Sequence, residues 1–123
     1  MNAPGRLRLG RDRRLHGPGV FARLKAAGGR RVAGCLILNW LARPDAPGSR
    51  AGFVVSRRVG DSVARSRARR LLREAFRLHQ YELQPPVDAV LIARPSIAGK
   101  PFAVVERDFL AAARHGGLLK PAA

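Results

Sequence analysis

Residues 62–80 read SVARSRARRLLREAFRLHQ, and this stretch decides how the rest of the chain can fold. Asp61 or Ser62 is a suitable N-cap for a helix, and Pro85-Pro86 ends the helical pattern. At 100° per residue one wide face of the helix is apolar, and it comprises Ala64, Ala68, Leu71, Leu72, Ala75, Phe76 and His79. The pattern predicts a helix that ends near Gln80 and packs this face against a sheet.

The opposite face of this helix is cationic. Arg73 stands four residues from both Arg69 and Arg77, and each such like-charge pair costs a few tenths of a kcal/mol. Glu74 alone offers relief on this face. A bound polyanion would remove the repulsion, so the pattern indicates a binding surface for one. The face carries Ser66, Arg69, Arg70, Arg73 and Arg77, with Arg65 and Arg67 at its borders.

The flanking sequence predicts one α+β domain, since 123 residues suit a single core. Residues 1–14 contain five arginines without an apolar period and predict a flexible basic N-terminal arm. A single folded domain is expected over residues 15–118, followed by a C-terminal tail over 119–123. Its elements are expected as a short helix over 20–27, strands over 32–42, 51–56 and 87–93, and a last helix over 101–114.

Composition narrows the class of partner. The chain carries a formal net charge of +16, and 19 of its 24 basic side chains stand in residues 1–77. A folded cation of this kind is expected to bind polyanions, nucleic acid first. Cys35 is the single cysteine, and no apolar run approaches the roughly 20 residues that cross a bilayer. A cytoplasmic protein with no membrane and no small-molecule partner is expected.

The sequence offers no catalytic constellation. The eight acidic residues are scattered, and no carboxylate pair stands at a predicted strand end to hold Mg²⁺. His16, His79 and His115 fall in three separate elements, and Cys35 opens an apolar strand as expected of a buried thiol. Neither catalytic nor metal-binding residues are expected in this chain.

A more specific signal comes from residues 65–77, which read Arg-Ser-Arg-Ala-Arg-Arg-Leu-Leu-Arg-Glu-Ala-Phe-Arg. This segment resembles the signature helix of the protein subunit of bacterial ribonuclease P. That signature reads Arg-Asn-Arg, then one residue of any kind, two basic residues, two apolar residues and Arg-Glu/Gln-x-Phe. The stretch from Gly52 to Gly60 resembles the family's strand and basic turn before that helix. Residues 88–94 resemble its last strand, and Arg14-Leu15, Phe21, Leu24 and Gly28 keep the spacing of its first helix.

Two positions depart from the family pattern. Ser66 stands where the family nearly always has Asn, so a single hydroxyl replaces a bidentate amide. Asn39 stands where relatives often carry an aromatic residue, and Trp40 beside it points to the opposite face of the strand.

The resemblance implies a fold. It is a single-domain α/β sandwich of the ribosomal-protein-like type, with about four strands and three helices in the order α-β-β-β-α-β-α. The family has an unusual left-handed β-α-β crossover around the signature helix, whereas the general rule predicts a right-handed one. The sequence does not decide between the two.

The resemblance also implies a function as the non-catalytic protein subunit of an endoribonuclease. In the family a catalytic RNA, with Mg²⁺ bound mainly by the RNA, removes the 5′ leader of precursor transfer RNA, and the protein assists by binding both RNAs. Residues implied in RNA binding are Arg57, Arg58, Arg65, Ser66, Arg67, Arg69, Arg70, Arg73 and Arg77. Phe21, Phe53 and Trp40 are implied in a leader cleft between the first helix and the sheet. Without the resemblance, the residues themselves would favour an ordinary core position for Phe21 and Phe53, and Trp40 is ambiguous in the same way.

Three other functions remain to be weighed. A DNA-recognition helix would present Asn or Gln to bases, whereas this outer face carries essentially arginine. A membrane-surface helix is disfavoured because the apolar side is rich in Ala and is needed to cover strands. A ribosome-associated or other structural RNA-binding protein of the same fold stays open.

Overall fold

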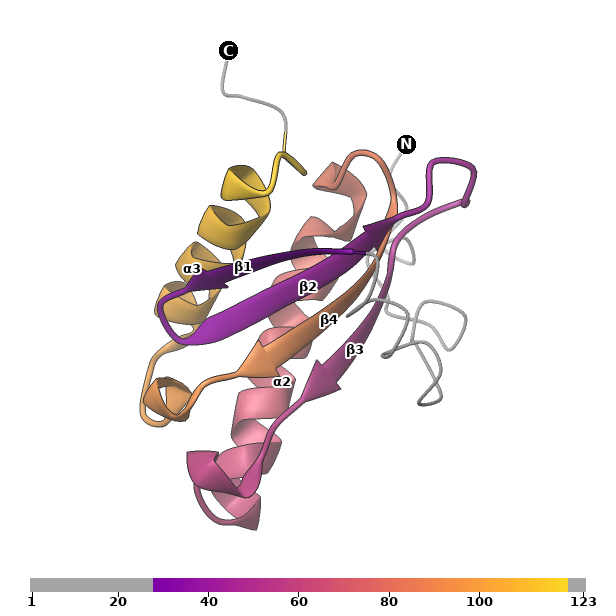
Figure 1. The fold of residues 1–123 in the computed structure, drawn as a ribbon. Coiled ribbons are helices and arrows are strands. Elements are labelled where there is room, and N and C mark those ends of the chain that lie inside the picture. The colour runs from indigo at the N-terminus through magenta and orange to yellow at the C-terminus, as the bar shows by residue number, and fades with distance from the viewer. Residues whose placement is uncertain (1–27, 120–123) are drawn as a thin grey trace.

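The computed structural model describes residues 28–119, which form one layer of strands and one layer of helices (Figure 1). The strands are β1 (Gly29–Ala33), β2 (Leu36–Ala42), β3 (Arg50–Val54) and β4 (Val87–Ala93). The helices are α2 (Ser62–His79) and α3 (Phe102–His115). Three short 3-10 helices connect them, namely η3 (Arg57–Val59), η4 (Gln80–Glu82) and η5 (Pro95–Ile97). The helix predicted over 20–27 and the arm over 1–14 lie outside the described residues.

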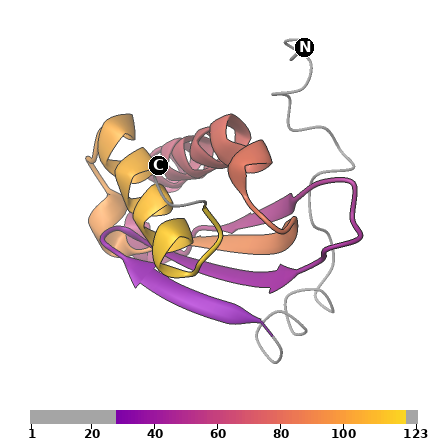
Figure 2. The ribbon, with the colours of Figure 1, turned by 90° about the horizontal axis from the view of Figure 1, so that it is seen from above.

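The four strands form one mixed sheet in the order β1-β2-β4-β3. β2 pairs antiparallel with both β1 and β4, and β3 pairs parallel with β4. Both described helices cover the same face of this sheet (Figure 2). The α+β class and the order of the described elements are confirmed.

The connection from β3 through α2 to β4 is left-handed. In Figure 1 these two parallel neighbours run downward, β4 lies to the left of β3, and α2 crosses behind the sheet. The general preference for right-handed crossovers is therefore wrong for this chain, and the expectation from the resemblance is confirmed. The helix α2 lies beside α3 on one face of the sheet, where it packs against β3, β4 and α3.

One predicted strand is in fact two. The continuous strand expected over 32–42 divides into β1 and β2, which join through a tight turn at Gly34-Cys35. Gly34 adopts φ +52°, a conformation that side chains resist. Asp108 of α3 fixes the turn, because its Oδ2 accepts a hydrogen bond from the Cys35 amide at 3.0 Å. The turn between β1 and β2 is thus held against α3.

The core lies between the sheet and the two helices. Phe76 of α2 is fully buried, with its ring 6.3 Å from Phe53 of β3 and 6.4 Å from Phe109 of α3, both in edge-to-face geometry. The predicted apolar face of α2 is confirmed at Ala68, Leu72, Ala75 and Phe76, which are buried, while Ala64, Leu71 and His79 at its margins are half-buried. Asp61 caps the helix through its Oδ1, which accepts from the Ala64 amide at 2.9 Å.

His79 joins the end of α2 to α3. Its Nδ1 lies 2.7 Å from a Glu82 carboxylate oxygen in η4, and its Nε2 lies 2.7 Å from a Glu106 carboxylate oxygen in α3. Burial opposes the charged ring, but the hydrogen bonds with Glu106 and Glu82 outweigh it and raise the pKa of His79 above 6.5. His79, expected as a packing residue at the border of the apolar face, therefore also joins α2 to η4 and α3 through its ring, and we call this arrangement the His79 clasp.

The clasp predicts a pH dependence of stability. Because the folded pKa of His79 is raised, its contribution is fully present below pH 6.5 and is lost as the pH rises through the folded pKa. Urea denaturation between about pH 6 and pH 8.5 should show the wild type losing more free energy of unfolding than His79→Gln. His115→Gln, at an exposed position, is the control and should follow the wild type. Parallel curves for wild type and His79→Gln would contradict the clasp.

Two glycines test the hairpin turn. Gly34 and Gly99 both have positive φ, but a Cβ at Gly34 would overlap the Asp108 carboxylate, whereas nothing lies within 4 Å at Gly99. Gly99→Ala should cost only the backbone strain, about 1–2 kcal/mol of unfolding free energy. Gly34→Ala should cost a further 1–3 kcal/mol or so, because it also displaces the acceptor of the Cys35 amide. Equal losses in urea denaturation would show that Asp108 does not fix the turn.

Candidate RNA interface

The residues predicted to bind RNA come from two consecutive elements, η3 and α2. We call them the arginine surface: Arg57, Arg58, Arg65, Ser66, Arg67, Arg69, Arg70, Arg73 and Arg77. Arg57, Arg58, Ser66 and Arg70 are exposed, and the others are half-buried along the flanks of α2. The structure therefore brings the whole predicted set to one continuous stretch of the molecule.

η3 is pinned at both ends, which fixes the two arginines it presents. The Ser56 hydroxyl accepts a hydrogen bond from the Arg58 amide at 3.3 Å, and the Val59 side chain is buried. Gly60 follows with φ +149°, and a Cβ there would meet the side chain of Ala64. The backbone of the turn therefore passes close to the first turn of α2, and the side chains of Arg57 and Arg58 stay exposed.

Two arginines on opposite flanks of α2 are held by neutral partners. The Arg73 guanidinium lies 5.9 Å from the centre of the Phe53 ring in β3, and such an interaction is worth about 0.5–1 kcal/mol at a partly exposed site. On the other flank Arg67 Nη2 donates to the Lys100 carbonyl oxygen at 2.9 Å. Both interactions orient a guanidinium without neutralising its charge.

One member of the arginine surface is paired with an acid. Arg77 donates to both carboxylate oxygens of Glu74, at 2.9 and 2.6 Å. The hydrogen bonds from Arg77 lower the pKa of Glu74, and the same bonds raise the pKa of Arg77. Within residues 28–119 the other seven arginines of the surface form no salt bridge. The cationic charge is therefore largely uncompensated inside the described part of the fold.

The fold adds basic residues that the sequence did not single out. η5 packs against η3, and the loop after η5 carries Lys100, whose carbonyl receives Arg67. Arg94, just before η5, donates to the Gly34 carbonyl oxygen at 2.9 Å. Residues 78–123 are nearly neutral as a stretch, so no local signal marked these two residues. The fold brings the Lys100 backbone to the flank of α2 and the Arg94 side chain to the turn between β1 and β2.

Phe53 and Trp40 lie on the sheet face that α2 and α3 cover. Phe53 packs on Phe76, and Trp40 packs on the same core, close to Gly29 and Gly116, where a Cβ would lie within 3 Å of its ring. This packing favours the core alternative for both residues. Their contact with a leader stays a prediction, and Phe21 lies outside the described residues.

The other face of the sheet is left open by both described helices (Figure 2). We call it the open face. Strand alternation places Asn39 there, opposite Trp40, as expected. Val90 is buried on this face among Leu41 and Ile92, and Val54 is 36% exposed beside them. A small apolar floor therefore lies on the side of the sheet opposite the arginine surface.

Two observations concern metal-binding and nucleophilic side chains in the described residues. Within 28–119 no three His, Cys, Asp or Glu side chains are arranged to hold a metal ion. Burial and the Asp108 carboxylate raise the pKa of the Cys35 thiol to about 12, so the thiolate does not form as a nucleophile near neutral pH. In the same part of the chain, no helix has the length and hydropathy needed to span a bilayer.

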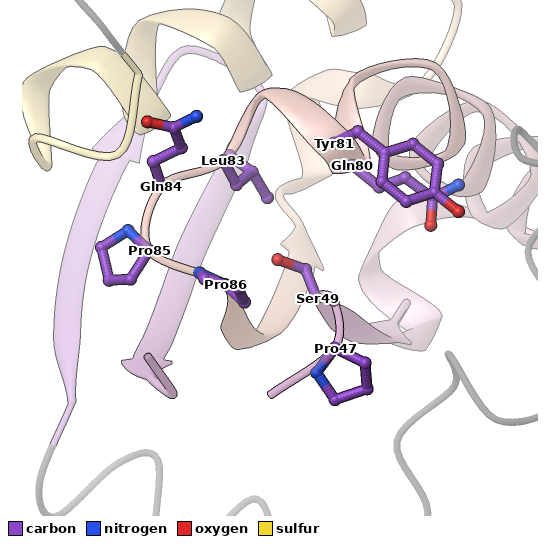
Figure 3. A pocket seen from close by; sticks show the side chains of 9 residues that line it. Pro47, Ser49, Gln80, Tyr81, Leu83, Gln84, Pro85 and Pro86 are labelled. Atoms are coloured by element: carbon purple, nitrogen blue, oxygen red, sulfur yellow. The ribbon is translucent and has the colours of Figure 1, made fainter. Parts of the chain in front are cut away.

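A cavity of about 400 Å³ lies next to the C-terminal end of α2, where η4 follows the helix (Figure 3). Its lining includes Ser49, Tyr81 and the segment from Leu83 to Pro86. Ser49 Oγ accepts a hydrogen bond from the Val87 amide at 2.9 Å. No member of the arginine surface lines it.

Comparison with known proteins agrees with this architecture. The solved structure of the Staphylococcus aureus RNase P protein superposes with a TM-score of 0.78 at 18% identity, covering 88% of this chain and 98% of that one. The RNase P protein of Thermotoga maritima gives a TM-score of 0.73 at 23% identity, covering 83% and 96%. At these identities the likeness shows the fold.

Sequence comparison shows the family. The Ribonuclease P protein component of Gluconacetobacter diazotrophicus is 36% identical over 110 residues, 88% of this chain and 94% of the relative. That of Chloroflexus aurantiacus is 40% identical over 107 residues, 86% of this chain and 78% of the relative. The sequence model of the Ribonuclease P family matches residues 9–116. The chain therefore belongs to the ribonuclease P protein family.

Proposed function

We propose that this protein binds the catalytic RNA of ribonuclease P through its arginine surface and thereby assists removal of the 5′ leader from precursor transfer RNA. The observation that carries the proposal is the uncompensated charge of α2. Seven arginines of the surface lack a carboxylate partner within the described residues, and the guanidinium fork suits phosphate. A folded RNA laid along the helix would neutralise them.

The bond-breaking step belongs, in this proposal, to the RNA. The carboxylates nearest the described core are already engaged: Asp88 by Arg43 and Arg50, Asp108 by the Cys35 amide, and Glu74 by Arg77. The Mg²⁺ that such a hydrolysis uses is then held mainly by RNA oxygens, which suit its preference for hard ligands. The protein contributes charge neutralisation and orientation.

The open face is our candidate for the 5′ leader. A single strand lying on the sheet needs a face that helices leave accessible, and α2 and α3 cover the other one. Asn39 and the apolar floor around Val90 offer a polar group and an apolar surface there. Phe53 and Trp40, on the covered face, would support the sheet in this arrangement rather than touch the leader.

Substitutions on α2 test RNA binding by the arginine surface. Arg70→Ala and Arg69→Ala should each weaken binding to the catalytic RNA and flatten the log–log dependence of affinity on salt by about 0.7–0.9 for each phosphate that the variant no longer neutralises. Arg114→Ala, an exposed arginine at the end of α3, is the matched control and should leave the slope unchanged. Affinity measured by fluorescence anisotropy across a salt series decides; an unchanged slope in both α2 variants would mean that these side chains face elsewhere.

The function itself is tested with purified components. The protein is mixed with the cognate catalytic RNA and a precursor transfer RNA at physiological Mg²⁺ and moderate salt. Faster release of the leader than with RNA alone is expected, because the protein neutralises phosphates that repel at low Mg²⁺. Absence of stimulation, together with tight binding to ribosomal RNA, would instead favour the ribosome-associated alternative.

A further inference from the structure

Two arginines share one buried carboxylate at the end of the open face. Asp88, the second residue of β4, is 2% exposed. Arg50 of β3 donates to it through Nε and Nη2, at 2.8 and 2.7 Å, in the bidentate geometry. Arg43, just after β2, adds a third bond through Nη1 at 3.0 Å. We call these three residues the Asp88 cluster.

The cluster holds more positive charge than its carboxylate requires. A buried carboxylate needs a partner, but Arg50 alone already satisfies both oxygens of Asp88. Arg43 is therefore surplus to charge compensation, and two guanidinium groups on one carboxylate leave a formal charge of +1. Asp45, in the adjoining loop, forms no salt bridge with either arginine within the described residues.

Both guanidinium groups also reach solvent. The side chains of Arg43 and Arg50 are 41% and 34% exposed, although their carboxylate is buried. Among the described residues nothing accepts from Arg43 Nε and Nη2 or from Arg50 Nη1. These donors are oriented in advance, because Asp88 fixes the groups that carry them. Binding an oxyanion here would cost less side-chain entropy than binding it to a free surface arginine.

The neighbourhood of the cluster fits a single strand. Strand alternation places Arg50 and Asp88 on the open face, the same face as the apolar floor of Leu41, Val90 and Ile92. Sites for single-stranded nucleic acid combine cationic groups for the backbone with an apolar surface for the bases. The cluster lies on the opposite side of the sheet from α2, which carries most of the arginine surface.

We propose that the Asp88 cluster is a phosphate-binding site for single-stranded RNA, with Arg43 as the residue added for that purpose. This rests on the proposed function, which supplies the strand: the 5′ leader of precursor transfer RNA. Asp88 is the positioning residue of the site. A leader long enough to extend along the open face contacts the cluster, and a very short one does not.

The experiment compares two precursor transfer RNAs that differ only in leader length, about two and about ten nucleotides, since single-strand grooves cover about 4–16 nucleotides. Each is bound to holoenzyme reconstituted with wild-type protein or Arg43→Gln. For the long leader, Arg43→Gln should weaken affinity about 3- to 10-fold and flatten the salt dependence by about 0.7. For the short leader, affinity should be unchanged. Arg43→Lys, which keeps a cation, should restore the slope, and Arg114→Gln should behave as wild type with both leaders.

Thermal unfolding separates binding from a structural role. Arg50 keeps both of its bonds to Asp88 in Arg43→Gln, so Tm should stay within about 2 °C of the wild type. Equal effects on the two leaders, no effect on the long one, or a large fall in Tm without a leader-dependent change in affinity would each overturn the proposal. Wild-type protein that stimulates cleavage while Arg43→Gln shows no dependence on leader length would overturn this inference alone. Failure of the wild type to stimulate cleavage of either precursor would overturn the proposed function and this inference with it.

Discussion

The packing of Phe76 between Phe53 and Phe109 is the constraint on which the rest of the structure depends. This ring joins β3, α2 and α3 in one core and fixes the rotation of α2 about its own axis. Arg73, three residues earlier, is then directed over Phe53, and Arg77 follows on the solvent side. The direction of the arginine surface is thus a consequence of core packing. Aromatic pairs of this geometry contribute about 0.5–1.5 kcal/mol each beyond area burial.

The packing energy of this core has to offset the electrostatic repulsion between the arginines of α2. The like-charge pairs along α2 sum to roughly 1 kcal/mol of repulsion, small against the several kcal/mol that a buried aromatic and its leucine neighbours contribute. The fold therefore tolerates a helix whose cationic side carries, within the described residues, a single ion pair, between Arg77 and Glu74. On the open face the arrangement is reversed, because there a buried carboxylate collects two arginines and fixes them.

Local periodicity accounts for what could be predicted. α2, its Asp61 cap and its two faces follow from a pattern with a 3.6-residue period, and Pro and Gly mark the neighbouring elements. The Gly34-Cys35 turn escapes prediction because apolar residues flank it on both sides and its conformation is fixed by Asp108, more than 70 residues away. The side of the sheet on which Phe53 lies escapes prediction because β3, after Arg50, has no polar residue in alternation to reveal its faces. The Asp88 cluster, the His79 clasp and the Arg67–Lys100 hydrogen bond all depend on residues far apart in the sequence.

The central claim is that the arginine surface lies against the catalytic RNA, and protection of individual arginines from an arginine-selective dicarbonyl reagent tests it most directly. Mass spectrometry would compare the extent of modification at each arginine in the free protein and in the reconstituted ribonucleoprotein. We expect Arg57, Arg58, Arg69 and Arg70 to be protected in the complex while Arg114 stays reactive, because a bound phosphate shields the guanidinium it contacts. Unchanged reactivity along α2 in a complex that still cleaves precursor transfer RNA would contradict the account.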